Sequence, residues 1–124
     1  MITGIDVVFL HVQDPIMMAE WYRETLGVEM GFQTPDLHWQ EFELDANRPP
    51  TRFGFDHVGG TVSSVEQQRV MISFGVKDIH QLIDNLEEKG VHFYGDPKIV
   101  DVGPTLFATT RDPEGNWLQF SQRK

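Results

Sequence analysis

An internal repeat constrains the fold of this chain more than any other feature of its sequence. Each copy consists of a β-rich run, an aspartate, a periodic apolar segment and a glycine, in that order. The copies stand about 64 residues apart, and a fixed spacing of this kind indicates duplication of one structural unit. Aspartate is a favoured helix N-cap, and glycine often follows a helix end. The pattern therefore predicts one helix at Pro15–Leu26, after Asp14, and another at residues 79–89, after Asp78.

Short strand-like segments surround each predicted helix. They are rich in β-branched and aromatic residues and are separated by turn residues. The first half contains them at residues 4–12, 28–33, 37–44 and 51–57, and the second at 70–76, 91–94, 105–110 and 116–121. Each half is thus expected to be a βαβββ module, which makes the chain an α+β protein. The expected bounds are roughly 1–58 for module 1, 59–66 for a polar linker and 67–124 for module 2.

Composition limits the classes of function. A chain of 124 residues with 40% hydrophobic content can bury one core, so we expect a single domain, residues 1–124. The absence of cysteine excludes disulfides and thiolate metal sites. A formal charge of -9 disfavours nucleic acid and anionic membranes as partners. No segment approaches about 18 apolar residues and the N-terminal residues lack the bases of a signal peptide, so we expect a cytoplasmic protein.

Two segments resemble a known family. The opening VVFLHVQDPIMMAEWYRETLG and the closing RDPEGNWLQFSQ, together with paired βαβββ modules, are similar to the vicinal oxygen chelate (VOC) superfamily, also called the glyoxalase/bleomycin-resistance/dioxygenase superfamily. The resemblance covers nearly the whole chain. It implies that the two modules form a curved mixed sheet around a cleft and that the chain forms a homodimer. It also implies either a divalent metal that serves lyase, isomerase or dioxygenase chemistry, or binding of a drug without chemistry.

The resemblance further implies where a metal would be held. Metal-using members carry His or Gln near the start of the first strand of each module and Glu in the fourth strand. In this chain those positions are Val7, roughly Gly54, Met71 and Gln119. Three of them offer no suitable donor to a cation, and the fourth offers only an amide oxygen. We therefore expect no metal at these positions and no cofactor.

Alternation along the strands selects candidate ligand-binding residues. Side chains in a strand point alternately to opposite faces. If Val8, Leu10 and Val12 pack under a helix, their neighbours face the cleft, and the same reasoning applies to the other strands. The predicted ligand-binding residues are Phe9, His11, Trp39, Glu41, Glu43, Asp56, Phe107, Trp117 and Gln119. Aromatic rings beside carboxylates favour a flat, cationic, drug-like ligand.

Three functions remain open at this point. The first is binding of a small molecule without a metal. The second is a metal-dependent enzyme, a glyoxalase-type lyase or isomerase or an extradiol-type dioxygenase, whose site is displaced to His11 and an acid such as Glu41, Glu43 or Asp56. The third is a domain without a ligand whose main property is dimerisation. The sequence contains no nucleophile motif, so no catalytic residue is assigned.

Overall fold

The computed structural model describes residues 7–44, 52–57 and 70–124. The chain forms two compact units, Met1–Ser63 (unit 1) and Ser64–Lys124 (unit 2). The predicted linker at 59–66 lies outside the described residues, as do Thr51 and the first residues of the predicted run 4–12.

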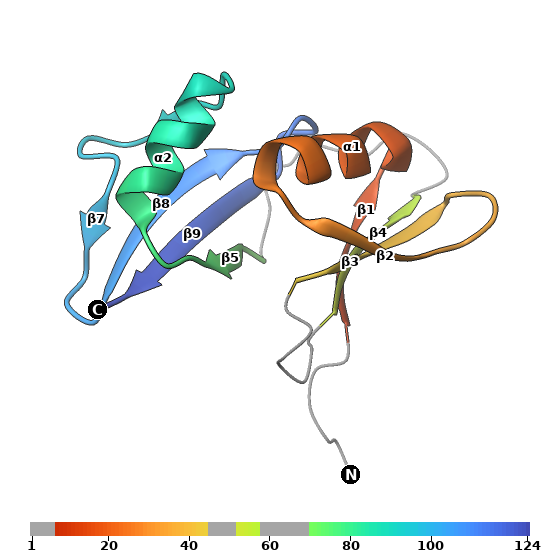
Figure 1. Cartoon of the computed structure of the whole chain (residues 1–124), viewed down its shortest axis with the longest axis horizontal. Helices are drawn as coiled ribbons and strands as arrows, with labels where there is room; N and C mark the ends of the chain where they lie inside the picture. Colours follow the sequence, from red (N-terminus) through yellow and green to blue (C-terminus); the bar gives the residue numbers. More distant parts are fainter. Residues whose placement is uncertain (1–6, 45–51, 58–69) are drawn as a thin grey trace, which may run out of the picture. The chain divides into compact units, whose positions relative to one another are not determined.

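Unit 1 is a four-stranded mixed sheet with one helix. Its elements are β1 (Val7–Val12), α1 (Pro15–Leu26), β2 (Glu29–Gln33), β3 (Trp39–Glu43) and β4 (Arg52–His57). The strand order is β1-β4-β3-β2. β1 runs parallel to β4, and the other neighbours are antiparallel. The helix packs against β3 and β4 (Figure 1).

Unit 2 repeats this plan. Its elements are β5 (Ile72–Gly75), α2 (Ile79–Glu88), β6 (Phe93–Tyr94), β7 (Val100–Asp101), β8 (Thr105–Arg111) and β9 (Trp117–Arg123). The strand order is β5-β9-β8-β6, with β7 also paired to β8. β5 is parallel to β9, and α2 packs against β8 and β9. The predicted α+β class, with two βαβββ units, is confirmed.

The predicted helix punctuation is present in both units. The Asp14 carboxylate accepts the Met17 N–H at 3.0 Å, and Gly27 ends α1 in the left-handed conformation with φ 72°. The Asp78 carboxylate accepts the Gln81 N–H at 3.0 Å. α2 ends at Glu88, one residue before the predicted end, because Lys89 is its C-cap. Side-chain capping supplies acceptors for N–H groups that have no partner within the helix.

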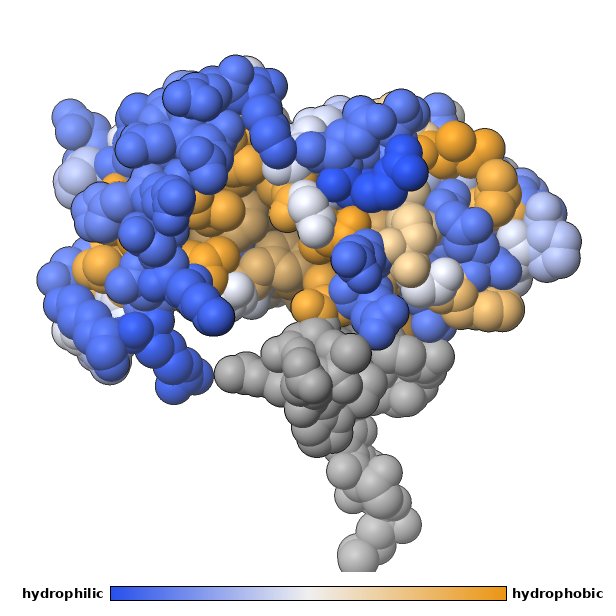
Figure 2. All heavy atoms as spheres, in the orientation of Figure 1, coloured by the Kyte–Doolittle hydropathy of each residue, from blue (hydrophilic) through white to orange (hydrophobic). Residues whose placement is uncertain are grey.

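Each helix covers one face of its sheet and buries an apolar core. In unit 1 the fully buried Tyr22 ring lies 4.9 to 5.8 Å from the rings of Phe42, Phe53 and Phe55. In unit 2 the buried side chains of α2 and of β9 include Ile83, Leu86, Leu118 and Phe120. Figure 2 shows hydrophilic residues over the outer surface of α2 and apolar residues beneath it.

Several strand predictions differ from the structure: β6 begins at Phe93, two residues after the predicted start, and β9 ends at Arg123, two residues after the predicted end. β3 begins at Trp39 instead of residue 37, because residues 34–38 form a turn. β5 is limited to Ile72–Gly75 within the predicted run 70–76. β7 was not predicted, because a strand of two residues is too short to show alternation. Neither described helix is long and apolar enough to cross a membrane.

Candidate functional site

The face of each sheet that is turned away from its helix, here called the helix-free face, carries the predicted site residues. On β1, Val12 is buried toward the helix whereas Phe9 and His11 are exposed. On β9, Leu118 and Phe120 are buried whereas Trp117, Gln119 and Ser121 are half-buried. This alternation agrees with the faces expected from the sequence.

Two rows of side chains cross the helix-free face of unit 1. The strand register places Phe9, Gly54 and Glu41 side by side in the first row, and His11, Asp56 and Trp39 in the second. Directly opposed residues on neighbouring strands are close enough for their side chains to interact. Five of the predicted residues are therefore brought together within unit 1, and we call Phe9, His11, Trp39, Glu41 and Asp56 the aromatic–acid cluster.

Two aromatic rings form the apolar part of the aromatic–acid cluster. The Phe9 and Trp39 ring centroids lie 5.0 Å apart at an interplanar angle of 62°, an edge-to-face contact. Phe9 also contacts the His11 ring edge-to-face at 5.5 Å. Phe9 is 40% exposed, so part of its side chain is accessible. An exposed aromatic ring offers its electron-rich face to a flat or cationic group.

Acidic groups lie beside these rings. The Trp39 Nε1–H donates to Glu41 Oε1 at 3.1 Å, and Glu41 is only 8% exposed. The Asp56 Oδ2 lies 3.7 Å from His11 Nδ1. Glu43 shares the face with Glu41, but it is exposed and lies opposite Glu29 on β2. The structure thus places Glu43 at the side of the cluster, with no hydrogen bond among the described residues.

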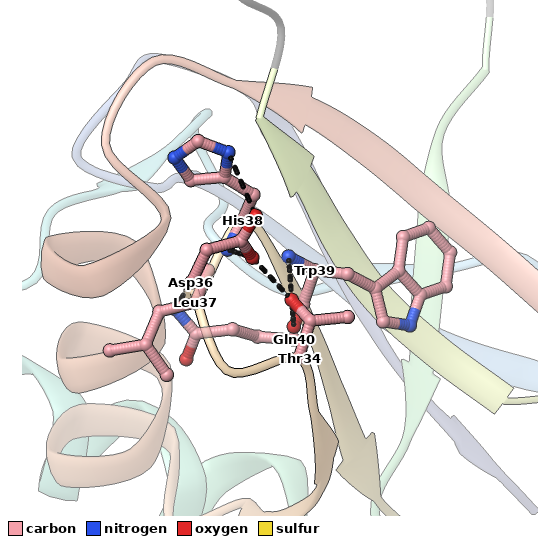
Figure 3. Close-up of polar contacts among 6 residues, drawn as sticks. All are labelled: Thr34, Asp36, Leu37, His38, Trp39 and Gln40. Carbon is pink, nitrogen blue, oxygen red and sulfur yellow. Dashed lines mark hydrogen bonds and ion pairs between the residues drawn. The ribbon is translucent and has the colours of Figure 1, made fainter.

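A hydrogen-bonded turn holds Trp39 in place (Figure 3). The Thr34 hydroxyl accepts the Trp39 N–H at 3.1 Å and donates to Asp36 Oδ1 at 2.7 Å. Asp36 Oδ1 also accepts the His38 N–H at 3.0 Å. These bonds to the backbone N–H of His38 and to Thr34 lower the pKa of the exposed Asp36 carboxyl below 3.8. Because the turn bonds the backbone of Trp39, it determines where β3 begins.

The residues at the implied metal positions do not fit a metal ion. Val7 and Gly54 lie on neighbouring strands and present no donor side chain. A Cβ built on Gly54 would lie 2.6 Å from the Gln40 carbonyl oxygen, so the backbone leaves no room for a larger residue. No group of three or more His, Asp or Glu within the described ranges is arranged to hold an ion. The His11–Asp56 pair therefore has no third His, Asp or Glu placed to join it there.

The helix-free face of unit 2 carries the other three predicted residues. Gln119 lies between Ser73 and Thr109, and Phe107 lies between Val100 and Ser121. The Ser73 and Ser121 hydroxyls are hydrogen-bonded to each other. Trp117 lies opposite Arg111, two rows from the row of Phe107. The structure therefore separates Phe107 from Trp117 rather than joining their rings.

Sequence reasoning missed two residues of this face. Arg111 lies with its Cζ 3.8 Å from the Trp117 ring centroid, and Tyr94 contacts the same ring at 5.0 Å. Alternation from Phe107 along β8 would have indicated Arg111, because the two are four residues apart and share a face. Tyr94 lies in a strand of two residues, where alternation gives little signal.

The turn between β8 and β9 positions this cluster. Asp112 Oδ1 accepts the N–H groups of Glu114 at 3.0 Å and of Asn116 at 2.9 Å. The Asn116 amide also donates to Asp112 Oδ2 at 2.9 Å. The Asp112 N–H in turn donates to the Asn116 carbonyl oxygen at 3.0 Å. A turn with so many bonds fixes the register that places Arg111 opposite Trp117.

A hollow of about 350 Å³ lies on the other side of unit 1, between α1 and the β2–β3 hairpin. Its lining includes Ile16, Met30 and the buried Gln40. The Gln40 amide donates to the Leu37 carbonyl oxygen and accepts from the Gln33 amide. The lining also contains the charged Glu20 and Arg23 of α1, but none of the residues predicted from the sequence lies in it, so the hollow is not part of the candidate site.

Comparisons with known proteins agree with the fold described above. The sequence profile of the Glyoxalase/Bleomycin resistance protein/Dioxygenase superfamily matches residues 4–120. No curated protein sequence matches the chain. A glyoxalase family protein from Bacillus anthracis has a similar structure, with 21% identity, a TM-score of 0.76, and coverage of 100% of this chain and 98% of that one.

Two further structures illustrate the range of functions on this fold. TnmS3, an antibiotic binding protein from Streptomyces sp. CB03234, is 19% identical with a TM-score of 0.78, and the match covers 99% of this chain and 98% of that one. A lactoylglutathione lyase from Agrobacterium tumefaciens is 14% identical with a TM-score of 0.72, and the match covers 97% and 93%. At these identities the similarity establishes the fold alone, since one fold hosts many functions.

Proposed function

We propose a small-molecule-binding function for this chain, which belongs to the Glyoxalase/Bleomycin resistance protein/Dioxygenase superfamily. The ligand is a flat, cationic, drug-like molecule that binds without a metal at the aromatic–acid cluster. The observation that carries the proposal is the contact of Phe9 with Trp39, at 5.0 Å, beside a Glu41 carboxylate that Trp39 holds at 3.1 Å.

The chemistry of the aromatic–acid cluster supports a cation. A cation over a well-placed ring gains about 0.5 to 2 kcal/mol, and an anion gains none of this. The Glu41 carboxylate is largely shielded from water, so its attraction for a cation is screened less than that of an exposed acid. The antibiotic binding protein with the same fold provides a precedent for ligand binding on this scaffold.

The proposal is tested with three compounds of one shape, 2-naphthylmethylammonium, 2-naphthamide and 2-naphthoate. The chain has three tryptophans, so replacing Trp21 and Trp117 by Phe leaves Trp39 as the only indole reporter. We expect the cation to quench Trp39 fluorescence at the lowest concentration, and its affinity to fall as salt rises.

Substitutions at the cluster provide the control. Glu41→Gln combined with Glu43→Gln should weaken binding of the cation several-fold and leave binding of the neutral amide unchanged. The proposal is wrong if 2-naphthoate quenches Trp39 best, or if the double substitution leaves the affinity for the cation unchanged.

A metal-dependent enzyme with a displaced site is the alternative. The observation that favours it is the proximity of His11 Nδ1 to Asp56 Oδ2, at 3.7 Å. Calorimetric titration of the metal-free protein with Zn²⁺ and Mn²⁺ separates the two functions. Stoichiometric binding that is lost in both His11→Ala and Asp56→Asn would support the alternative, whereas our proposal predicts no such binding.

The expected assembly and location are also proposals. We infer a cytoplasmic homodimer without nucleic acid or membrane partners, which the family resemblance and the charge of -9 support. A domain with dimerisation as its main property would dimerise but would bind none of the three naphthyl compounds. Sedimentation of the protein tests whether it is a dimer, and the fluorescence titration tests whether it binds a naphthyl compound.

A further inference from the structure

We propose that unit 2 carries a site for the carboxylate of a flat aromatic acid, formed by Arg111, Tyr94 and Trp117 on its helix-free face. All three residues belong to unit 2.

The position of Arg111 is the first observation. Its guanidinium carbon lies 3.8 Å from the Trp117 ring centroid and 5.8 Å from that of Tyr94. The two rings meet edge-to-face, with centroids 5.0 Å apart and an interplanar angle of 74°. Stacking on a ring fixes the orientation of the guanidinium plane but uses none of its five N–H donors. The stacked Arg111 therefore keeps its donors for an acceptor.

The second observation is an unmet hydrogen bond. The Nε of Arg111 is buried and has no hydrogen-bond partner among the residues that the structure describes. A buried donor without an acceptor costs free energy, and an acceptor supplied by a ligand recovers it. Tyr94 is 40% exposed and forms the accessible side of the cluster.

The third observation concerns the nearest acid in the sequence. Asp112 follows Arg111 directly, but its carboxylate accepts the N–H groups of Glu114 and Asn116 and the Asn116 amide. No carboxylate within the described ranges forms an ion pair with Arg111, although the chain has 19 acidic and only 10 basic residues. The bonds of the turn thus occupy the Asp112 carboxylate, and the Arg111 guanidinium remains available for an external anion.

A carboxylate is the anion that fits this arrangement. Guanidinium and carboxylate form two parallel N–H···O bonds in one plane. A flat ring attached to that carboxylate can then lie against Tyr94, while Thr109 and Gln119, neighbours in the row beside Trp117, supply neutral hydrogen-bonding groups. Neutral groups at this place suit an anionic ligand, whereas a carboxylate at residue 119 would repel it.

The test uses 2-naphthoate, with 2-naphthamide as its neutral match and 2-naphthylmethylammonium as the cation. We expect 2-naphthoate to shift the ¹⁵N-detected Nε–Hε resonance of Arg111 in a saturable manner. Arg111→Gln should weaken binding ten-fold or more, and Arg111→Lys should weaken it less while keeping the charge. Arg123→Gln, which removes the same charge from an exposed place in the same sheet, should change affinity less than two-fold.

Several results would overturn the site. They are equal binding of 2-naphthamide, an unmoved Arg111 resonance, or unchanged affinity in Arg111→Gln. If Arg111→Gln does not fold, two measurements still test the site. They are the shift of the Arg111 resonance in the unsubstituted protein and the affinity of the Arg111→Lys variant for 2-naphthoate. The proposed cation site is followed through Trp39 fluorescence and this site through the Arg111 resonance, so failure of the cation site and failure of this site are distinguishable.

Discussion

Trp39 donates its indole N–H to Glu41, two residues further along the same strand, across 3.1 Å. The two side chains point the same way because a strand has a period of two residues. Glu41 is 8% exposed, so the bond holds a carboxylate where water has little access to it. The orientation of the aromatic–acid cluster therefore depends on this contact.

A double-mutant cycle measures that contact. Trp39→Phe and Glu41→Met, alone and together, should show a coupling of about 1 to 3 kcal/mol in the free energy of unfolding, because the acceptor is charged and largely buried. The same cycle with Glu43→Met in place of Glu41→Met should show less than about 0.5 kcal/mol. Urea unfolding at neutral pH gives both values, and equal couplings in the two cycles would contradict the arrangement.

Gly54 should tolerate no side chain. Its added Cβ would lie 2.6 Å from the Gln40 carbonyl oxygen, and a backbone atom cannot rotate away as a side chain can. We expect Gly54→Ala to destabilise the protein by about 1 to 3 kcal/mol. Gly75→Ala is the matched control, because Gly75 is also a strand glycine and its Cβ would meet nothing within 4 Å. Thermal unfolding of both variants tests this, and similar melting temperatures would contradict it.

The turn before Trp39 should depend on pH through Asp36. Because its pKa in the folded protein lies below the reference value of 3.8, the stability that Asp36 contributes is complete above pH 3.8. That contribution is lost as the pH falls through the lower folded-state pKa. We therefore expect the difference in stability between the unsubstituted protein and Asp36→Asn to shrink in acid.

The change in acid should also be visible at Trp39. With Trp21 and Trp117 replaced by Phe, its fluorescence should change below pH 3.8, and that change should be smaller when Asp36→Asn is added. Asp101 is the control, because the Lys124 ammonium and the Gly103 N–H lower its pKa as well, but it lies in unit 2. A response of Trp39 fluorescence to Asp101→Asn equal to that of Asp36→Asn would refute the assignment.

Local sequence patterns were sufficient to predict where the helices lie and which side chains share a face of each strand. Asp14 and Asp78 begin helices because a carboxylate can bond N–H groups three residues ahead, which is a contact within one short segment. Alternation separated Phe9 and His11 from Val12 for a similar reason, since the period of a strand is a property of its own backbone. The same patterns could not predict short elements such as β7, because two residues show no period.

The sequence by itself determined the duplicated plan, the two helices and the side of each sheet on which a residue lies. Only the tertiary structure decided which residues of one face touch, such as Phe9 with Trp39 and Arg111 with Trp117 and Tyr94. The reason is that these contacts depend on which strands pair and in what register, and a shift of one residue would send every side chain to the other face. That register is set by hydrogen bonds between distant segments, such as β1 with β4, and by turns such as the one that Asp112 stabilises.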